Sequence, residues 1–395
     1  MLDNGELVNG NVCHVAKTEV KDRLNTNGIK HDSGSLNKRS LWDSWLRSYG
    51  LKPKAETAEC YHESFILHGY RPTPSSVLYC VKSLFHPTNE TLNVWTHLIP
   101  FVIAATRHFK FANEIMTERG YTDPLFYPYW FFVLGVVLTF FGSSLAHTFN
   151  CLTPGAREAC FCCDYGCIAI QCIGLATCFT FYICPYTCVI PHTGSYHLAY
   201  FAIIVGSMMA VPIVCYSRLP YVPYRYVLRI AVYVVLYTSL CLPCFYKYLT
   251  FTPEPQFKTC GIAISDESRR NFFELTCIMA LSATVNGLRF PERILPGWFD
   301  IVGHSHQIFH VLIAGGLYYQ NKFIEGALRE ILGRLDEGTL SVDDLNITWY
   351  SAFLFPAMNG LISMVLTFVF SVVLCRRQNL QFGENCQKNK SKKAQ

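Results

Sequence analysis

Eight stretches of mostly apolar residues constrain what this chain can fold into more than any other feature of its sequence. The bilayer core offers the backbone no water, so a chain crosses it as helices that satisfy their own hydrogen bonds, and each crossing takes about 20 apolar residues. We expect crossings at residues 92–106, 129–149, 161–184, 198–216, 227–245, 272–288, 301–319 and 351–375. The sequence therefore predicts an all-α, multi-pass membrane helix bundle with a seven-helix core and an eighth, C-terminal span.

The composition indicates lipid rather than water as the solvent. Of the 395 residues, 51% are apolar and 15% are charged, whereas an average soluble domain has about 25% charged residues. The net charge of +5 lies mainly near the two ends, and no basic stripe is interleaved with aromatic residues, so we expect no nucleic-acid partner. The first, sixth and seventh spans are short or interrupted by polar residues, and one of them could instead be a re-entrant or interfacial segment.

Polar and basic segments at the two ends define the domain organisation. We expect a disordered polar cytoplasmic tail at 1–55, the transmembrane bundle at 56–377 and a basic cytoplasmic tail at 378–395. The first 40 residues lack the apolar core of a signal peptide, so the first span should direct insertion. The charges of the loops are nearly balanced and do not fix the orientation. An even number of spans and two basic ends favour both termini in the cytoplasm, with the sequon at Asn346 outside.

A short amphipathic helix is expected before the first span. Trp42, Trp45, Leu46 and Tyr49 follow i, i+3, i+4, i+7 spacing and therefore share one helical face. Such a face suits a helix that lies on the membrane surface with its tryptophans at headgroup depth. Contact with a soluble partner is the equal alternative.

Polar side chains recur at helical spacing in and beside the spans. Glu90, Asn93 and His97 follow i, i+3, i+7 and lie on one face of a helix, and Ser143 and His147 follow i, i+4 in the second span. A polar group within a span is costly and therefore points to function. The first three residues can also be hydrogen-bonding links between helices, which contribute about 1 kcal/mol per bond.

Two histidines in the seventh span have the spacing of a helical metal site. His306 and His310 follow i, i+4 and place two imidazoles on one face, while His304 points away. A third histidine from another helix, such as His147, would complete three nitrogen ligands and leave a fourth position for water, as in catalytic zinc sites. Asp164, at the start of the third span, could then hold or deprotonate that water. In the alternative interpretation these histidines are interior groups that form hydrogen bonds between helices, and spacing alone does not bring His147 to the pair.

In this combination and order, the motifs resemble those of the progestin and adipoQ receptor family. They are Glu-x2-Asn-x3-His at 90–97, Ser-x3-His at 143–147, Asp-Tyr at 164–165 and His-x3-His at 306–310, and the resemblance runs from about Gly69 to Arg377. The runs at 88–97, 144–149 and 291–310 are similar to the membrane progestin receptor branch, of gamma or delta type. An eighth span also fits that branch, whereas the long polar N-terminus departs from the short one of the gamma type.

The resemblance implies a Zn²⁺ ion held by His147, His306 and His310, with Asp164 and Ser143 near the metal-bound water. It also implies a lipid-filled cavity in a receptor of the cell membrane, which binds progestin-type steroids and signals rapidly through inhibitory heterotrimeric G proteins. In this reading the polar contacts to the ligand come from groups such as Asn93, Gln171 or His97.

The family also resembles alkaline ceramidases in these residues. The alternative function is therefore a zinc-dependent lipid amidase, in which zinc polarises the amide carbonyl and Asp164 shuttles the proton. A transporter with a midplane site is less favoured, because the sequence shows no inverted repeat or pair of broken helices.

Overall fold

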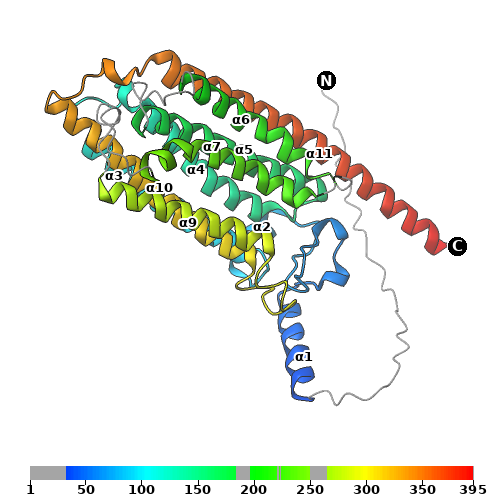
Figure 1. The fold of residues 1–395 in the computed structure, drawn as a ribbon. Coiled ribbons are helices and arrows are strands. Elements are labelled where there is room, and N and C mark those ends of the chain that lie inside the picture. The colour runs from blue at the N-terminus through cyan, green and yellow to red at the C-terminus, as the bar shows by residue number, and fades with distance from the viewer. Residues whose placement is uncertain (1–32, 184–195, 220–221, 223, 250–264, 395) are drawn as a thin grey trace, which may run out of the picture.

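Long helices packed side by side make up almost all of the computed structural model, which describes residues 33–183, 196–219, 222, 224–249 and 265–394. Within these ranges eight helices have more than 20 residues each (Figure 1), and they are α3 (Thr91–Met116), α4 (Tyr127–Phe149), α5 (Pro154–Cys178), α6 (Tyr196–Tyr216), α7 (Arg225–Leu249), α9 (Asp266–Leu288), α10 (Ser305–Asp336) and α11 (Phe355–Ala394). The same residues form no strand, only an isolated bridge between Lys52 and Tyr70. Each long helix covers one of the eight predicted spans, so the predicted helical bundle is confirmed.

Shorter elements join the long helices. Two are α-helices, α1 (Ser33–Ser48) and α2 (Val77–Lys82). The 3₁₀ turns are η1 (Lys54–Glu56), η2 (Glu59–Tyr61), η3 (Ser83–Phe85), η4 (Pro124–Phe126) and η6 (Asp343–Leu345). Two π-helical turns, η5 (Phe179–Ile183) and η7 (Trp349–Leu354), continue α5 and precede α11. The N-terminal α1 and the C-terminal end of α11 emerge from the same end of the bundle (Figure 1).

The connection between α4 and α5 shows how the sequence sets the helix ends. The Thr153 hydroxyl accepts a hydrogen bond from the Ala156 amide at 3.0 Å, and Pro154 occupies the first turn of α5. A threonine cap followed by proline satisfies a free amide and presets the helical φ angle. The two helices therefore pack antiparallel through a short turn, and this turn directly follows the histidine of α4.

Glycines allow α4 and α5 to approach closely. A Cβ atom at Gly174 would lie 2.4 Å from the Phe131 carbonyl oxygen, and one at Gly135 would lie 2.5 Å from Gln171 Cα. Small residues at such contacts let two backbones pack closely in a membrane, where there is no hydrophobic drive to associate. The close contact places Gln171 of α5 directly against α4.

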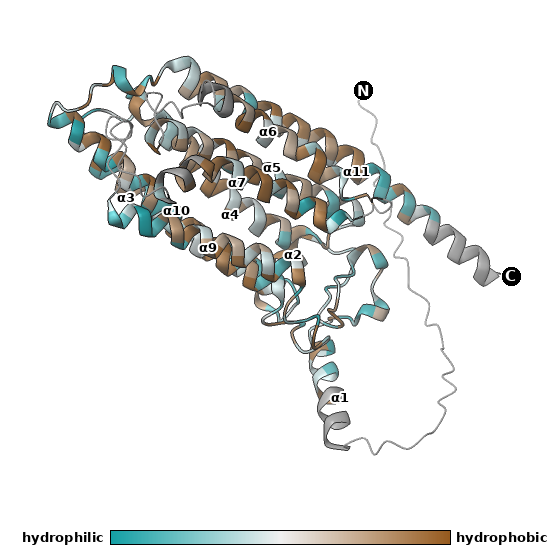
Figure 2. Cartoon of the chain, viewed as in Figure 1, coloured by the Kyte–Doolittle hydropathy of each residue, from teal (hydrophilic) through white to brown (hydrophobic). Residues whose placement is uncertain are grey.

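The surface of the bundle is suited to lipid. Four helical stretches of the described chain are long and apolar enough to cross a membrane, namely Pro124–Phe149, Pro154–Ile183, Arg225–Leu242 and Trp349–Glu384, and Tyr200–Tyr216 is a shorter apolar helix. Hydrophobic residues dominate the middle of the bundle and hydrophilic residues are more frequent at its ends (Figure 2). The three remaining long helices, α3, α9 and α10, cover the three predicted spans that contain polar residues. Their length is sufficient, and their buried polar side chains lower their hydropathy.

Several boundaries differ from those expected. Helix α3 runs to Met116 and α10 to Asp336, well beyond residues 106 and 319, because a helix keeps its internal hydrogen bonds after its side chains become polar. The same reason applies to residues 378–394 of the expected basic tail, which continue α11 as a helix. Residue 184, the expected end of the third span, and residues 1–32 lie outside the described residues.

The expected tail at 1–55 is also helical in part. Residues 33–48 form α1, and Leu46 is buried in a cluster with Leu51 and Ile301. Trp42 and Trp45 stack with ring centroids 4.9 Å apart and remain exposed. The expected amphipathic face is therefore divided, because Leu46 packs against the segment before α10 while the aromatic rings face outward.

Candidate metal centre and ligand cavity

Three histidines from two helices converge near one end of the bundle. The ligand atoms of His147, His306 and His310 all lie within 4.8 Å of one another, and His306 Nε2 is 3.3 Å from His147 Nε2. His147 lies at the C-terminal end of α4, and the other two lie in the first two turns of α10. Zn–N bonds of about 2.1 Å in a tetrahedron separate the nitrogens by roughly 3.3 Å. The histidine cluster, as we call these three residues, therefore has a spacing that fits one zinc ion.

Hydrogen bonds orient two rings of the histidine cluster. His147 Nδ1 lies 2.7 Å from Glu90 Oε2, and His310 Nδ1 lies 3.0 Å from the Asn93 carbonyl oxygen. A carboxylate and a carbonyl oxygen only accept hydrogen bonds, so each neutral ring carries its proton on Nδ1 and presents an unprotonated Nε2. Metal-binding histidines in proteins are commonly held in this way. The donor chemistry as well as the spacing therefore fits a metal.

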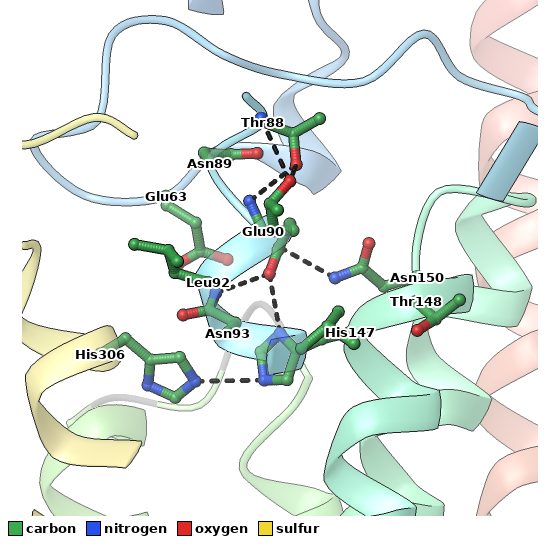
Figure 3. Close-up of polar contacts among 12 residues, drawn as sticks. Glu63, Thr88, Asn89, Glu90, Leu92, Asn93, His147, Thr148, Asn150 and His306 are labelled. Carbon is green, nitrogen blue, oxygen red and sulfur yellow. Dashed lines mark hydrogen bonds and ion pairs between the residues drawn. The ribbon is translucent and has the colours of Figure 1, made fainter. Parts of the chain in front are cut away.

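Glu90 connects the start of α3 to the histidine cluster. Its carboxylate accepts hydrogen bonds from Asn93 Nδ2 at 2.7 Å, from His147 at 2.7 Å and from Asn150 Nδ2 at 2.9 Å (Figure 3). Glu90 is buried, and these donors compensate for the loss of water around its charge. Glu90 and Asn93, which the sequence spacing placed on one helical face, thus hold the histidine rings in position.

His97, the third residue of that set, packs against the histidine cluster without joining it. Its ring stacks on the ring of His310 with centroids 3.8 Å apart and planes inclined by 7°. Both of its nitrogens are buried, and neither has a hydrogen-bond partner in the described part of the chain. His97 also lines the cavity described below, so its nitrogens are available to a ligand.

Arg71 is a residue of this site that sequence reasoning missed. Its buried guanidinium donates to the carbonyl oxygens of His147 and Thr148 at 2.7 and 2.8 Å, to Asn150 Oδ1 at 2.5 Å and to Ser83 Oγ at 3.1 Å. The last carbonyls of a helix have no partner within it, and a cation there is favourable. Arg71 thus fixes both the end of α4 and the side chain of Asn150. Arg71 lies in the run Gly69-Tyr-Arg-Pro72 at the start of the resemblance, but the sequence assigns it no role and does not identify its partners.

The start of α10 is held by a second buried carboxylate. Glu292 accepts hydrogen bonds from the amide and the hydroxyl of Ser305, the first residue of the helix. The Gln307 side chain binds the Gly303 amide at 2.6 Å and the Ile301 carbonyl oxygen at 2.8 Å. His304 Nε2 contacts the Asn89 carbonyl oxygen at 3.1 Å and lies outside the cluster. These contacts fix the turn that carries His306.

A cavity of about 2260 Å³ adjoins the histidine cluster. Side chains of α3, α4, α5, α7, α9, α10 and α11 line it, and all three clustered histidines are among them. Ser143 and Asp164 also line it, so the structure brings every candidate residue of the sequence to one space. Neither side chain forms a hydrogen bond with another described residue. The volume of the cavity exceeds the roughly 300–1,000 Å³ of most ligand pockets.

The interior of the cavity is mainly apolar but also carries polar side chains, among them Thr139, Tyr237 and Asn286. Its walls include aromatic and aliphatic side chains such as Phe245, Met279 and Leu317. Gln171 Nε2 donates to Gln320 Oε1 at 2.7 Å, and the buried Gln171 Oε1 has no partner among the described residues. Gln320 lies ten residues beyond His310 on α10, about 15 Å along the helix axis. The cavity therefore has polar groups at two separated positions with mainly apolar walls between them.

Comparisons with known proteins agree with this architecture. A family profile described as haemolysin-III related matches residues 85–321. The chain is 32% identical to membrane progestin receptor gamma-A of Danio rerio, over 68% of this chain and 80% of that protein. It is 33% identical to membrane progestin receptor delta of Mus musculus, over 66% and 74%, and 31% identical to membrane progestin receptor gamma of Homo sapiens, over 67% and 78%.

Proposed function

This chain belongs to the family of haemolysin-III-related proteins, and we propose that it is a membrane receptor that binds a progestin-type steroid in the cavity between its helices. The resemblance expected from the polar motifs is confirmed by the matching family and by relatives named as membrane progestin receptors. These relatives support a membrane receptor of this family. The steroid, the metal and the signalling partner are the proposal.

The observation that carries the proposal is the set of unpaired polar atoms in a mainly apolar cavity, which includes Thr139 Oγ1, Tyr237 OH and Asn286 Oδ1. Near the histidine cluster, Asn93 Oδ1 and both nitrogens of His97 are buried without partners in the described chain, and deeper in the cavity Gln171 Oε1 is in the same state. Buried polar atoms without partners are costly and call for a ligand or water. A steroid has a rigid apolar body with polar groups at its two ends, which complements this arrangement.

Binding of labelled progesterone to the purified chain tests the proposal. Gln171→Leu should weaken saturable binding roughly tenfold, because a carbonyl oxygen of the ligand would lose the second N–H of the Gln171 amide as a buried donor. Gln381→Leu makes the same change at the cavity mouth, away from the apolar interior, and should leave affinity unchanged. Absence of saturable binding by the folded parent would remove the steroid from the proposal.

We also propose that His147, His306 and His310 hold one zinc ion. An ion bound by α4 and α10 would tie the two helices together and supply a Lewis acid with one position open to a polar group. Metal analysis should find about one zinc per chain in the parent and in His304→Ala, and none in His306→Ala, since two histidines rarely retain zinc. Equal zinc content in both variants contradicts this assignment.

Signalling through inhibitory G proteins is the expected output of the receptor. Cells that express the chain should show a rapid fall in cyclic AMP when progesterone is added, and cells that express Gln171→Leu should need a higher steroid concentration for the same fall. A response of equal sensitivity in cells without the chain would assign the signal to another protein.

Lipid amide hydrolysis is the less favoured alternative, because the relatives carry receptor names. Asp164 and Ser143 line the cavity with the histidine cluster, so the alternative has a defined test. Asp164→Asn removes a proton-accepting carboxylate at nearly constant size, and in an amidase it should lower ceramide turnover by about 10²–10⁴. A receptor without hydrolase activity shows no turnover in either protein, and its zinc content and steroid affinity change little.

A further inference from the structure

Three arginines that have no carboxylate partner among the described residues gather around one aromatic ring at the cavity mouth. The guanidinium carbons of Arg225, Arg229 and Arg289 lie 5.1, 5.3 and 5.2 Å from the centroid of the Tyr226 ring. All four residues line the cavity. Arg225 and Tyr226 begin α7, whereas Arg289 ends α9, so residues about sixty positions apart in the chain form this arginine cluster.

The nearby carboxylates are already paired with other groups. Glu63 binds Arg157 at 2.5 Å, and Glu158 binds Arg218 at 2.7 Å. Glu292, three residues after Arg289, accepts its hydrogen bonds from Ser305. No ion pair with any of the three arginines occurs in the described residues, and the undescribed neighbours Pro220, Tyr221 and Pro223 have no carboxylate to offer. In the part of the chain that the structure describes, no carboxylate neutralises the positive charge of the arginine cluster.

The start of α7 adds to this positive potential. Arg225 is the first residue of α7, where free amides and the helix dipole attract anions. Arg229 donates from Nε to the Ser217 hydroxyl at 2.8 Å and from Nη2 to the Ser217 carbonyl oxygen at 3.2 Å, so its Nη1 remains for an anion, and serine does not neutralise its charge. Three like charges held close together repel one another unless an anion lies between them. Guanidinium groups bind phosphate through two parallel hydrogen bonds and are well suited to such an anion.

The surroundings of the arginine cluster are those of a membrane interface. Tyr224 is 83% exposed and Trp298 is 76% exposed, and the apolar side chains of Phe290 and Ile294 are exposed as well. Aromatic rings beside arginines are typical of the depth at which lipid headgroups lie. The segment after Arg289 also carries Ile301, which packs against Leu46 of α1, so the cluster lies at the end of the bundle from which α1 projects (Figure 1).

We propose that Arg225, Arg229 and Arg289 bind the phosphate of an anionic phospholipid headgroup at the mouth of the cavity, with Tyr226 as the surface on which the guanidinium groups stack. This lipid would be a membrane component, distinct from the ligand in the apolar interior. Basic pockets between membrane helices bind such headgroups elsewhere. The site requires neither zinc nor steroid, so its test is independent of the proposed receptor function.

Lipid retention by the full chain in nanodiscs tests this proposal. The chain is reconstituted in phosphatidylcholine with phosphatidic acid as a minor lipid, and bound lipid is measured by native mass spectrometry. The triple variant Arg225→Gln, Arg229→Gln, Arg289→Asn should bind phosphatidic acid roughly 100-fold more weakly than the parent. The control Arg119→Gln, Arg269→Gln, Arg270→Gln loses the same charge at the opposite helix ends and should bind as the parent does. Equal retention by parent and triple variant, or an equal loss in the control, overturns the proposal.

A single substitution tests the site even if the triple variant fails to fold. Arg289 has a φ of +55°, a left-handed conformation that asparagine tolerates well, so Arg289→Asn removes one charge without backbone strain. It should weaken phosphatidic acid binding several-fold while the thermal unfolding of the protein stays unchanged. Inorganic phosphate added to the parent separates the two sources of the anion. Retained lipid that resists competition supports a headgroup site, and displacement of the lipid by phosphate at equal concentration would assign the cluster to a soluble anion instead.

Discussion

Glu90 accepts hydrogen bonds from three side chains at once, and one of the donors is His147. The carboxylate sets which nitrogen of that ring is free to bind a metal, and Asn150 and Asn93 set the position of the carboxylate. Arg71 in turn holds Asn150 and the last carbonyls of α4. At the residue scale, the histidine cluster is therefore supported by a continuous chain of charged and amide groups.

Replacement of Glu90 tests that support directly. Glu90→Gln keeps the size of the side chain but removes the charge that stabilises the Nδ1–H tautomer of His147. Zinc affinity should fall 10- to 100-fold, the usual effect of losing an outer partner of a metal-binding histidine. Competition with a chromogenic chelator measures it. Glu114→Gln, an exposed glutamate of the same helix paired with Arg329, is the control and should bind zinc as the parent does.

Replacement of Arg71 tests the end of α4. A lysine keeps the charge, but it cannot reproduce the fork that reaches two carbonyls and Asn150 together. Arg71→Lys should lower the free energy of unfolding by about 1–3 kcal/mol, since at least one buried acceptor loses its partner. Thermal unfolding in detergent measures the loss. Arg119→Lys, at an exposed ion pair with Asp336, should unfold at the parent temperature, and an equal shift in both variants would contradict the special role of Arg71.

At the scale of the helices, the close packing of α4 and α5 positions both the histidine cluster and the deep glutamine pair. Gly174 faces the backbone of Phe131, and Gly135 faces Gln171. These contacts leave no room for a Cβ atom, so the glycines fix how near the two helices lie. Helix α7 packs less closely than α4 and α5, because its apolar stretch is the least buried of the four. Its start carries the arginine cluster at the cavity mouth.

Alanine substitutions at two glycines distinguish the effect of close helix packing from the effect of helix propensity. Gly174→Ala would place a Cβ 2.4 Å from a backbone oxygen, so α4 and α5 must move apart, and we expect a loss of about 1–3 kcal/mol in stability. Gly315→Ala in α10 meets nothing within 4 Å and should be neutral or stabilising by up to about 1 kcal/mol. Thermal unfolding of both variants in the same detergent measures the difference. Similar destabilisation of both would show that close approach is not the cause.

At the scale of the whole molecule, the eight long helices of the described residues return the chain to the end of the bundle at which α1 lies. The described part of α1 and the end of α11 lie at that end, and the turn with Asn346 lies at the other. The buried polar groups of the histidine cluster lie close to the first end, and the cavity extends from there between the helices. The hydrophobic residues that prevail between the two ends suit a bilayer (Figure 2).

Topology mapping tests the orientation. We expect tags inserted near Gly5 and Lys390 to be detected only in permeabilised cells, because both ends should be cytoplasmic. Asn346 should carry a glycan, which a glycosidase removes and which Asn346→Gln lacks. Staining of either tag on intact cells, or an unglycosylated Asn346 in a tag-negative cell, contradicts this orientation.

The sequence by itself determined the number and order of the long helices, because a membrane span depends on the local length of an apolar run. It also determined that His306 and His310 share a face, since i, i+4 spacing fixes that within one helix. The expected ends of the seventh and eighth spans were too early, because they were placed where polar residues such as Lys322 and Arg376 begin. Polar side chains mark the edge of the lipid, whereas the backbone hydrogen bonds of the helix continue beyond it.

Only the tertiary structure decided which residues from different helices meet. It brought His147 to His306, placed Glu90 and Arg71 behind them, and left Gln171 beside Gln320 in the cavity. It also gathered Arg225, Arg229 and Arg289 around Tyr226. The physical reason is that spacing along a helix fixes a face, whereas contacts between helices depend on how small residues such as Gly135 and Gly174 let those faces approach.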